Sequence, residues 1–193
     1  MAFIVQITTN PLPYESSLDD RSLSDIALLV IHCTELPDLA MAREYGEKVL
    51  YPSGTGNSGH YYIDRDGSIH CWVKREKIAH HVKGHNASSI GIELINLGRY
   101  PDWHHSQHQQ PTEPYPDKQI DALIALIKHL HSHIPSLQHI TGHEDIDQST
   151  LPAANDPQQK VRRKTDPGPL FPWDFVMKNI QLINIGSHAK YYQ

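Results

Sequence analysis

The chain has 193 residues, of which 38% are hydrophobic and 20% charged, and its formal net charge is -5. This length favours a single domain with an ordinary core. The acidic balance, without a basic face, argues against a nucleic-acid-binding protein, and no apolar run approaches the roughly 20 residues that a membrane-spanning helix needs. Two cysteines, Cys33 and Cys71, are too few for a disulfide framework, so we expect both to be free and reduced.

The two ends of the chain carry weaker signals than its middle. The segment that begins Met1-Ala-Phe-Ile-Val-Gln lacks the basic and apolar regions of a secretory signal, which predicts a cytoplasmic protein. Residues 1–24 are polar and rich in turn formers, and we expect them to form an N-terminal arm over the surface. Residues 25–183 should form the domain itself, and residues 184–193 a frayed C-terminal tail.

The first half of the domain predicts a buried strand, a helix and a hairpin. The run Ile26-Ala-Leu-Leu-Val-Ile31 is continuously apolar, as in a strand buried on both faces, and it ends at His32. Residues 38–50 have helical spacing and stop at Tyr51-Pro52. After the glycine-rich loop 53–59, which lacks the Gly-Lys-Ser/Thr of a phosphate loop, an Asp-Gly turn joins two alternating segments at residues 60–64 and 69–73.

A second apolar strand carries an isolated carboxylate. In Ser89-Ile-Gly-Ile-Glu93-Leu-Ile-Asn96, Glu93 is surrounded by apolar neighbours. A buried and unpaired carboxylate is costly, so this side chain needs either a partner or a shifted pKa. A structural salt bridge and a functional role both satisfy that requirement.

The second half of the chain alternates polar excursions with regular elements. Residues 98–115 are polar and proline-rich, which is typical of a lid or a disordered segment. A helix follows from Asp117, and its apolar face comprises Ile120, Leu123, Ile124, Ile127 and Leu130. A short strand at 138–141 delivers His143, a long loop spans 147–163, and a last helix is expected at about 172–183. This order of elements predicts one α/β (mixed α+β) domain with a central mixed sheet flanked by helices.

Three segments far apart in the sequence present residues that suit a metal. In Arg163-Lys-Thr-Asp-Pro-Gly-Pro169 the prolines hold the chain extended, so Lys164 and Asp166 point to the same side. His32 and His143 each follow a strand, and with Asp166 they would form a His₂Asp zinc centre that keeps one coordination position open. Cys33 and His60 remain alternative ligands. The pair His129 and His133, four apart on a helix, is expected to face water.

Five segments resemble one enzyme family in sequence and order: Val30–Thr34, Gly59–Gly67, Ser89–Leu94, Thr141–His143 and Arg163–Pro169. Together they are similar to the zinc-dependent N-acetylmuramoyl-L-alanine amidases, which share their fold with the peptidoglycan-recognition proteins. Within that family the likeness is greatest to the cytoplasmic cell-wall-recycling branch, and it covers roughly residues 25–183.

The resemblance implies a role for each residue of the site. His32, His143 and Asp166 would bind Zn²⁺, Glu93 would act as the general base, and Lys164 would stabilise the oxyanion. The implied reaction is hydrolysis of the amide between N-acetylmuramic acid, expected in its 1,6-anhydro form, and L-alanine in a peptidoglycan fragment, by a monomer that takes part in cell-wall degradation and recycling. Candidate substrate contacts are His60, His81 and Asn86.

Two other functions fit the same resemblance. One is a peptidoglycan-binding module that does not cut, and the other is a lytic amidase that acts on the intact cell wall. The chain departs from the recycling branch between His32 and His60, at His80-His81 where the family often has Trp-His, and in the histidine-rich segment 98–115. These departures leave the substrate preference open.

Overall fold

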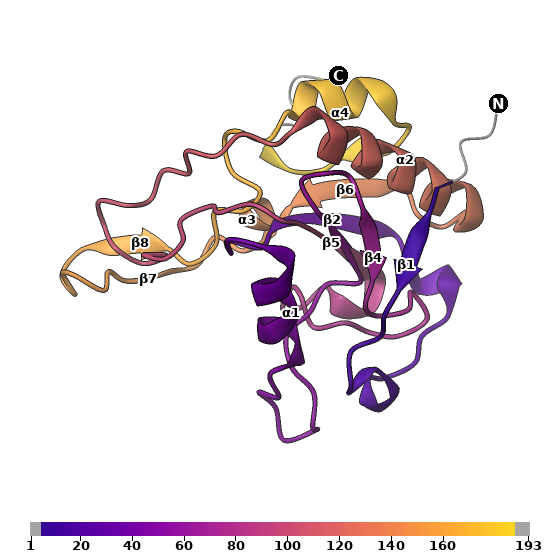
Figure 1. Cartoon of the computed structure of the whole chain (residues 1–193), viewed down its shortest axis with the longest axis horizontal. Coiled ribbons are helices and arrows are strands. Elements are labelled where there is room, and N and C mark those ends of the chain that lie inside the picture. Colours follow the sequence, from indigo (N-terminus) through magenta and orange to yellow (C-terminus); the bar gives the residue numbers. More distant parts are fainter. Residues whose placement is uncertain (1–4, 188–193) are drawn as a thin grey trace.

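A sheet in the order β1-β4-β3-β5-β2-β6-β9 forms the centre of the computed structural model, which describes residues 5–187 (Figure 1). Its strands are β1 (Ile7–Thr9), β2 (Leu28–Cys33), β3 (Tyr61–Ile63), β4 (Ile69–Cys71), β5 (Ser89–Leu94), β6 (His139–Gly142) and β9 (Ile183–Asn184). The hairpin pair β3 and β4 is antiparallel, while the other neighbouring strands of this sheet run parallel. The mixed sheet predicted from the sequence is confirmed.

The two faces of the central strands β2 and β5 differ in the residues that they carry. Leu29 and Ile31 of β2 and Ile90 and Ile92 of β5 are fully buried in the main hydrophobic cluster, which also includes residues of the long helix α2 (Asp117–His133). Because side chains alternate along a strand, His32, Gly91 and Glu93 must point to the opposite face. The packing of one face therefore determines which residues are available on the other.

Helices cover both faces of the sheet. Helix α2 and α4 (Trp173–Asn179) lie together on one side, above the sheet in Figure 1, while α1 (Leu39–Glu47) lies on the other. Asp38 caps the N-terminus of α1, and its carboxylate accepts a hydrogen bond from the Met41 backbone N–H. The short helix α3 (His143–Ile146) follows β6, and 3₁₀ turns occur at 15–17, 23–25 and 86–88. None of the helices in residues 5–187 is long and apolar enough to cross a membrane.

The N-terminal segment takes a larger part in the fold than an arm over the surface. β1 pairs with β4 at the edge of the sheet, and Leu12, Tyr14 and Leu18 are buried in a second hydrophobic cluster beneath α1. The sequence did not indicate this strand, because three residues are too few to show an alternating pattern.

Other predicted elements have different bounds or a different structure, most of them nearer the C-terminus. The expected loop 147–163 contains a two-stranded sheet of β7 (Thr150–Pro152) and β8 (Lys160–Arg162). The last helix ends at Asn179 instead of Ile183, because Ile180 is extended and Ile183 then pairs with His139 of β6. The first helix likewise ends at Glu47, where Lys48 becomes extended. Of the predicted tail, residues 188–193 lie outside the described residues.

Residues 98–115 are tied to the rest of the molecule rather than free of it. The Ala154 backbone N–H donates to the His104 carbonyl at 2.8 Å, which joins this segment to the β7–β8 hairpin beside it (Figure 1). At its start, the Arg99 guanidinium donates to Glu35 at 2.6 and 2.8 Å. These side chains are 1% and 10% exposed, so they form a buried ion pair.

We predict that Arg99→Ala lowers the free energy of unfolding by about 3–5 kcal/mol, because it leaves the Glu35 carboxylate buried without its partner. Urea denaturation would measure the loss. Glu44→Ala, which breaks the exposed i,i+4 pair with Lys48, is the control and should cost less than about 1 kcal/mol. Equal losses in the two variants would contradict the prediction.

Candidate metal centre

The register of the sheet places the site residues next to one another. His32 pairs with Glu93 across β2 and β5, and Glu93 pairs with Tyr62 across β5 and β3. On the other side of β2, Ile31 pairs with Gly142, the last residue of β6, so that His143 follows beside His32. Tyr62, Glu93, His32 and His143 therefore form a row across the face of the sheet opposite α2.

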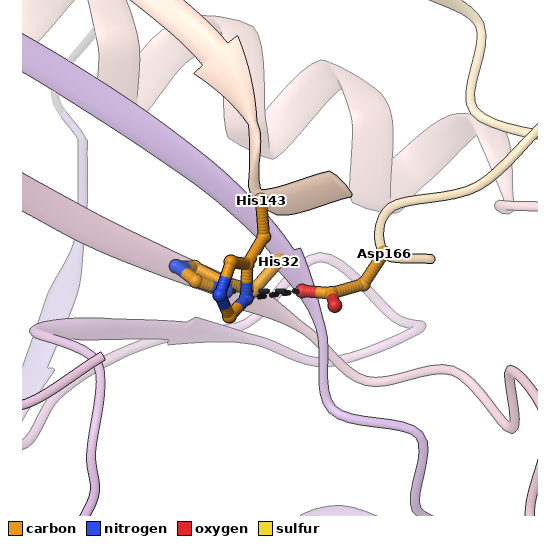
Figure 2. A group of neighbouring side chains, drawn as sticks. All are labelled: His32, His143 and Asp166. Atoms are coloured by element: carbon orange, nitrogen blue, oxygen red, sulfur yellow. Dashed lines mark hydrogen bonds and ion pairs between the residues drawn. The ribbon is translucent and has the colours of Figure 1, made fainter. Parts of the chain in front are cut away.

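Asp166 completes the group from a loop (Figure 2). Its Oδ2 lies 3.0 Å from Nδ1 of His32 and 3.1 Å from Nδ1 of His143. The loop is fixed by the Glu144 backbone N–H, which donates to the Asp166 carbonyl at 2.8 Å. Gly142 permits the close approach, since a Cβ there would lie 2.8 Å from Cδ of Pro167.

These three residues have the chemistry of a metal site. They are 2–3% exposed, and their potential ligand atoms all lie within 4.8 Å of one another. Oδ1 of Asp166 and Nε2 of His143 are buried without a hydrogen-bond partner, which is unusual for polar atoms in a protein interior. Two imidazole nitrogens and a carboxylate oxygen are ligands that zinc accepts, so the residues present fit the metal that the sequence predicted.

Electrostatics keep Asp166 ionised. Burial by itself raises the pKa of this carboxyl, but the charges of His143 and Lys164 and the hydrogen bonds with both histidines outweigh burial and lower the pKa well below its ordinary value. Asp166 is therefore an anion at neutral pH, as a metal ligand must be.

Glu93 and Lys164 flank the three ligands. Oε1 of Glu93 lies 4.0 Å from Nδ1 of His32, and burial raises the pKa of this carboxyl. Gly59 makes room for it, because a Cβ at that position would lie 2.6 Å from Cγ of Glu93. The ammonium of half-buried Lys164 lowers the pKa of both Glu93 and Asp166, which shows that its charge acts on the site.

A cavity of about 1210 Å³ opens on this group, and its walls combine several segments of the chain. The wall residues on α1 and the segment after it include Tyr45, Lys48 and Tyr51, and Asp147 and Arg163 also line the cavity. The arrangement joins three ligands, a largely buried carboxylate and an ammonium at the edge of a large open space. Such a site is equipped for metal-assisted hydrolysis.

The three candidate substrate contacts lie in different places. His81 and Asn86 line the cavity, whereas His60 is fully buried and does not. Nδ1 of His60 accepts a hydrogen bond from the Gly91 backbone N–H at 3.1 Å, so its contacts are structural. The Asn86 Oδ1 accepts from the backbone N–H groups of His81 and Val82 at 3.1 and 2.8 Å, which shapes this part of the cavity wall.

The alternative ligands predicted from the sequence are not in the group. Cys33 packs in the main hydrophobic cluster, and its thiol donates to the Asn96 carbonyl at 3.4 Å. Burial raises the pKa of this thiol well above its ordinary value, which disfavours the thiolate that would bind a metal. Both cysteines are free, as predicted.

Sequence reasoning missed Ser89 and Gly91, which lie behind the site on β5. A Cβ at Gly91 would lie 2.6 Å from Cγ and Nδ1 of His81, so only glycine lets that ring lie against the strand. A glycine inside an otherwise apolar strand is a signal of such close approach.

Comparison with models of known protein families shows which family the chain belongs to. The Amidase_2 family model, described as N-acetylmuramoyl-L-alanine amidase, matches residues 22–169. The chain belongs to this family. The match includes all five segments on which the resemblance was based, and the predicted fold class is confirmed with it.

Individual relatives have moderate identity. The chain is 33% identical over 120 residues to the 1,6-anhydro-N-acetylmuramyl-L-alanine amidase AmpD of Enterobacter cloacae, covering 58% of this chain and 50% of that one. It is 32% identical over 165 residues to the N-acetylmuramoyl-L-alanine amidase AmiD of Escherichia coli K12, covering 77% and 51%. The chain thus spans about half the length of the curated relatives it matches.

Several similar solved structures contain a ligand. AmpDh3 of Pseudomonas aeruginosa, in complex with anhydromuramic pentapeptide, has a TM-score of 0.61 and 26% identity, and the match covers 80% of this chain and 60% of that one.

We expect the reconstituted protein to bind close to one zinc per chain, and His143→Ala to lose most of that affinity because it removes one of the three ligands. Chelator competition and elemental analysis would measure both. His133→Ala, which removes an exposed histidine of α2, should bind zinc like the parent. A parent protein without zinc after reconstitution would refute the ligand assignment.

Proposed function

We propose that this chain is a zinc-dependent N-acetylmuramoyl-L-alanine amidase that acts on soluble peptidoglycan fragments. It hydrolyses the amide between N-acetylmuramic acid, in its 1,6-anhydro form, and L-alanine. The observation that carries this proposal is the convergence of His32, His143 and Asp166 beside Glu93 at the edge of the cavity.

The size of the cavity supports a substrate made of a sugar and a peptide. Pockets for drug-sized ligands have about 300–1,000 Å³, and the cavity of about 1210 Å³ exceeds that range. The names of relatives point the same way, since AmpD is a 1,6-anhydro-N-acetylmuramyl-L-alanine amidase and AmpDh3 binds an anhydromuramic pentapeptide.

The metal ligands would hold zinc at the reacting amide. Bound zinc supplies a Lewis acid that polarises a carbonyl oxygen and makes water more acidic. Asp166 contributes the negative charge of the ligand set, and the two histidines contribute neutral nitrogens. The row of paired strands keeps His32 and His143 in place, so little reorganisation is needed when substrate binds.

Glu93 would move the proton. Its carboxylate sits beside the ligands on a rigid central strand, where it can take a proton from the attacking water and pass it to the leaving amine of L-alanine. The pKa raised by burial makes the carboxylate a stronger base than an exposed glutamate. The products are the free muramic acid carboxylate and a peptide with L-alanine at its N-terminus.

Lys164 would stabilise the charge that develops on the amide oxygen. It lies two residues before Asp166 in the same loop and on the wall of the same cavity. An ammonium fixed near a developing oxyanion favours the transition state over the neutral ground state.

Two alternatives remain outcomes of the tests below. A binding module without activity would have no need for Glu93 and Lys164 beside the metal ligands. An amidase of intact cell wall would use the same groups, and only the choice of substrate separates it from the proposal. The cytoplasmic location and the monomeric state stay predictions.

Glu93→Gln should retain zinc and lose about 10²–10⁴-fold in turnover, because the amide cannot accept the proton. Mass spectrometry of products from soluble anhydro-muropeptides would show a free peptide with the parent and almost none with the variant. Intact sacculi serve as the second substrate and should release little product. A parent that cuts only sacculi would favour the lytic amidase, and one that binds zinc but cuts neither would favour the binding module.

Lys164→Met should reduce kcat by about 10²–10³-fold with a smaller change in KM, because an interaction that grows in the transition state is lost. Steady-state kinetics on a soluble muropeptide would measure both constants. Lys160→Met removes an exposed lysine of β8 outside the cavity and should leave both unchanged. A large rise in KM at constant kcat would make Lys164 a substrate-binding residue instead.

A further inference from the structure

His81 lies between the metal ligand His32 and Ser89 of β5 and contacts both. Its Nδ1 lies 3.0 Å from Nε2 of His32, on the side of the ring away from Asp166. Its other nitrogen, Nε2, lies 3.2 Å from the hydroxyl of Ser89, which is fully buried. The ring therefore bridges His32 and β5.

The hydrogen bond that Ser89 donates determines the direction of the others in this series. The Ser89 hydroxyl donates its one proton to the His85 carbonyl at 2.8 Å, since a carbonyl can only accept. Its oxygen must then accept from Nε2–H of His81. A neutral imidazole carries one proton, so Nδ1 of His81 is an acceptor.

These hydrogen bonds also determine how the metal ligand His32 is protonated. Nδ1 of His81 accepts from Nε2–H of His32, which fixes a proton of the His32 ring on Nε2. Without metal, Nδ1 of His32 also donates, since the Asp166 carboxylate at 3.0 Å can only accept. A bound metal would take the place of that Nδ1 proton, and the one proton left on the ring would be the Nε2–H that His81 accepts. A ligand histidine whose other nitrogen donates to a fixed acceptor keeps both its tautomer and its orientation.

The surroundings of His81 hold it in this position. Gly91 leaves the space that its ring occupies. Asn86 accepts from the backbone N–H of His81, and His60 accepts from the backbone N–H of Gly91. Of the residues first considered as substrate contacts, Asn86 thus supports His81 in the cavity wall, and His60 supports the strand behind it.

We propose that His81 is a positioning residue that, with Ser89, fixes the Nε2–H tautomer of His32 so that Nδ1 binds the metal. This inference rests on the proposed zinc site. It gives His81 a role in metal affinity, whereas a substrate contact would affect only the binding of muropeptide.

The test compares zinc affinity and the protonation of His32. His81→Leu should weaken zinc binding by about 10–100-fold, the usual effect of losing an outer partner of a ligand histidine. His81→Asn should recover most of the affinity, because its Oδ1 replaces the acceptor at Nδ1. His80→Leu, from the same loop, should bind zinc like the parent, and circular dichroism would confirm that each variant is folded.

A second measurement needs no variant. A long-range ¹H–¹⁵N correlation spectrum of the zinc-loaded parent should show the His32 proton on Nε2 and none on Nδ1. Zinc bound through Nε2 of His32, or unchanged affinity in folded His81→Leu, would overturn the role of His81. In either case a parent that binds zinc and cuts muropeptide would leave the proposed function intact, whereas a parent without zinc would refute the proposed zinc site itself.

Discussion

The register between β2 and β5 is the constraint on which the site depends. It places His32 beside Glu93, and a slip of either strand by one residue would turn that strand's site residue into the core. Packing on the far face prevents such a slip, because Leu29, Ile31 and Ile90 are fully buried against the α2 side of the sheet. The position of the polar groups is therefore set by apolar side chains that never contact substrate.

Asp166 has no such strand to hold it, and its loop depends on contacts from elsewhere. Arg99 donates to the carbonyls of Arg162 and Arg163 at 3.0 and 3.2 Å while it pairs with Glu35. The same guanidinium thus supports the start of the 98–115 segment and the approach to Lys164. Stability and the geometry of the site are coupled here, and a defect in this pair should affect both.

Local patterns in the sequence predicted the parts of the molecule that carry strong periodicity. The apolar run before His32, the amphipathic helix from Asp117 and the Asp-Gly hairpin need only neighbouring residues to be recognised. β1, β9 and the β7–β8 hairpin have two or three residues each and exist through pairing with distant segments. The metal ligands came from the family resemblance, since spacing alone left Cys33 and His60 as alternatives. The support of His81 on Gly91 depends on a contact between chain segments that no local pattern contains.

The polar groups of the site are costly for the fold, and this cost explains their arrangement. Burying His32, His143 and Asp166 beside the largely buried Glu93 forgoes apolar packing. Replacing buried ionic groups by well-packed apolar residues is often neutral or stabilising. Two carboxylates in one enclosed region also repel each other, as the influence of Asp166 on the pKa of Glu93 shows. A positive charge among them relieves that repulsion, and Lys164 supplies only part of it from a half-buried position. A divalent cation bound by the two histidines and Asp166 would supply the rest, so the same electrostatics that make the cluster unfavourable as core make it suitable as a metal site.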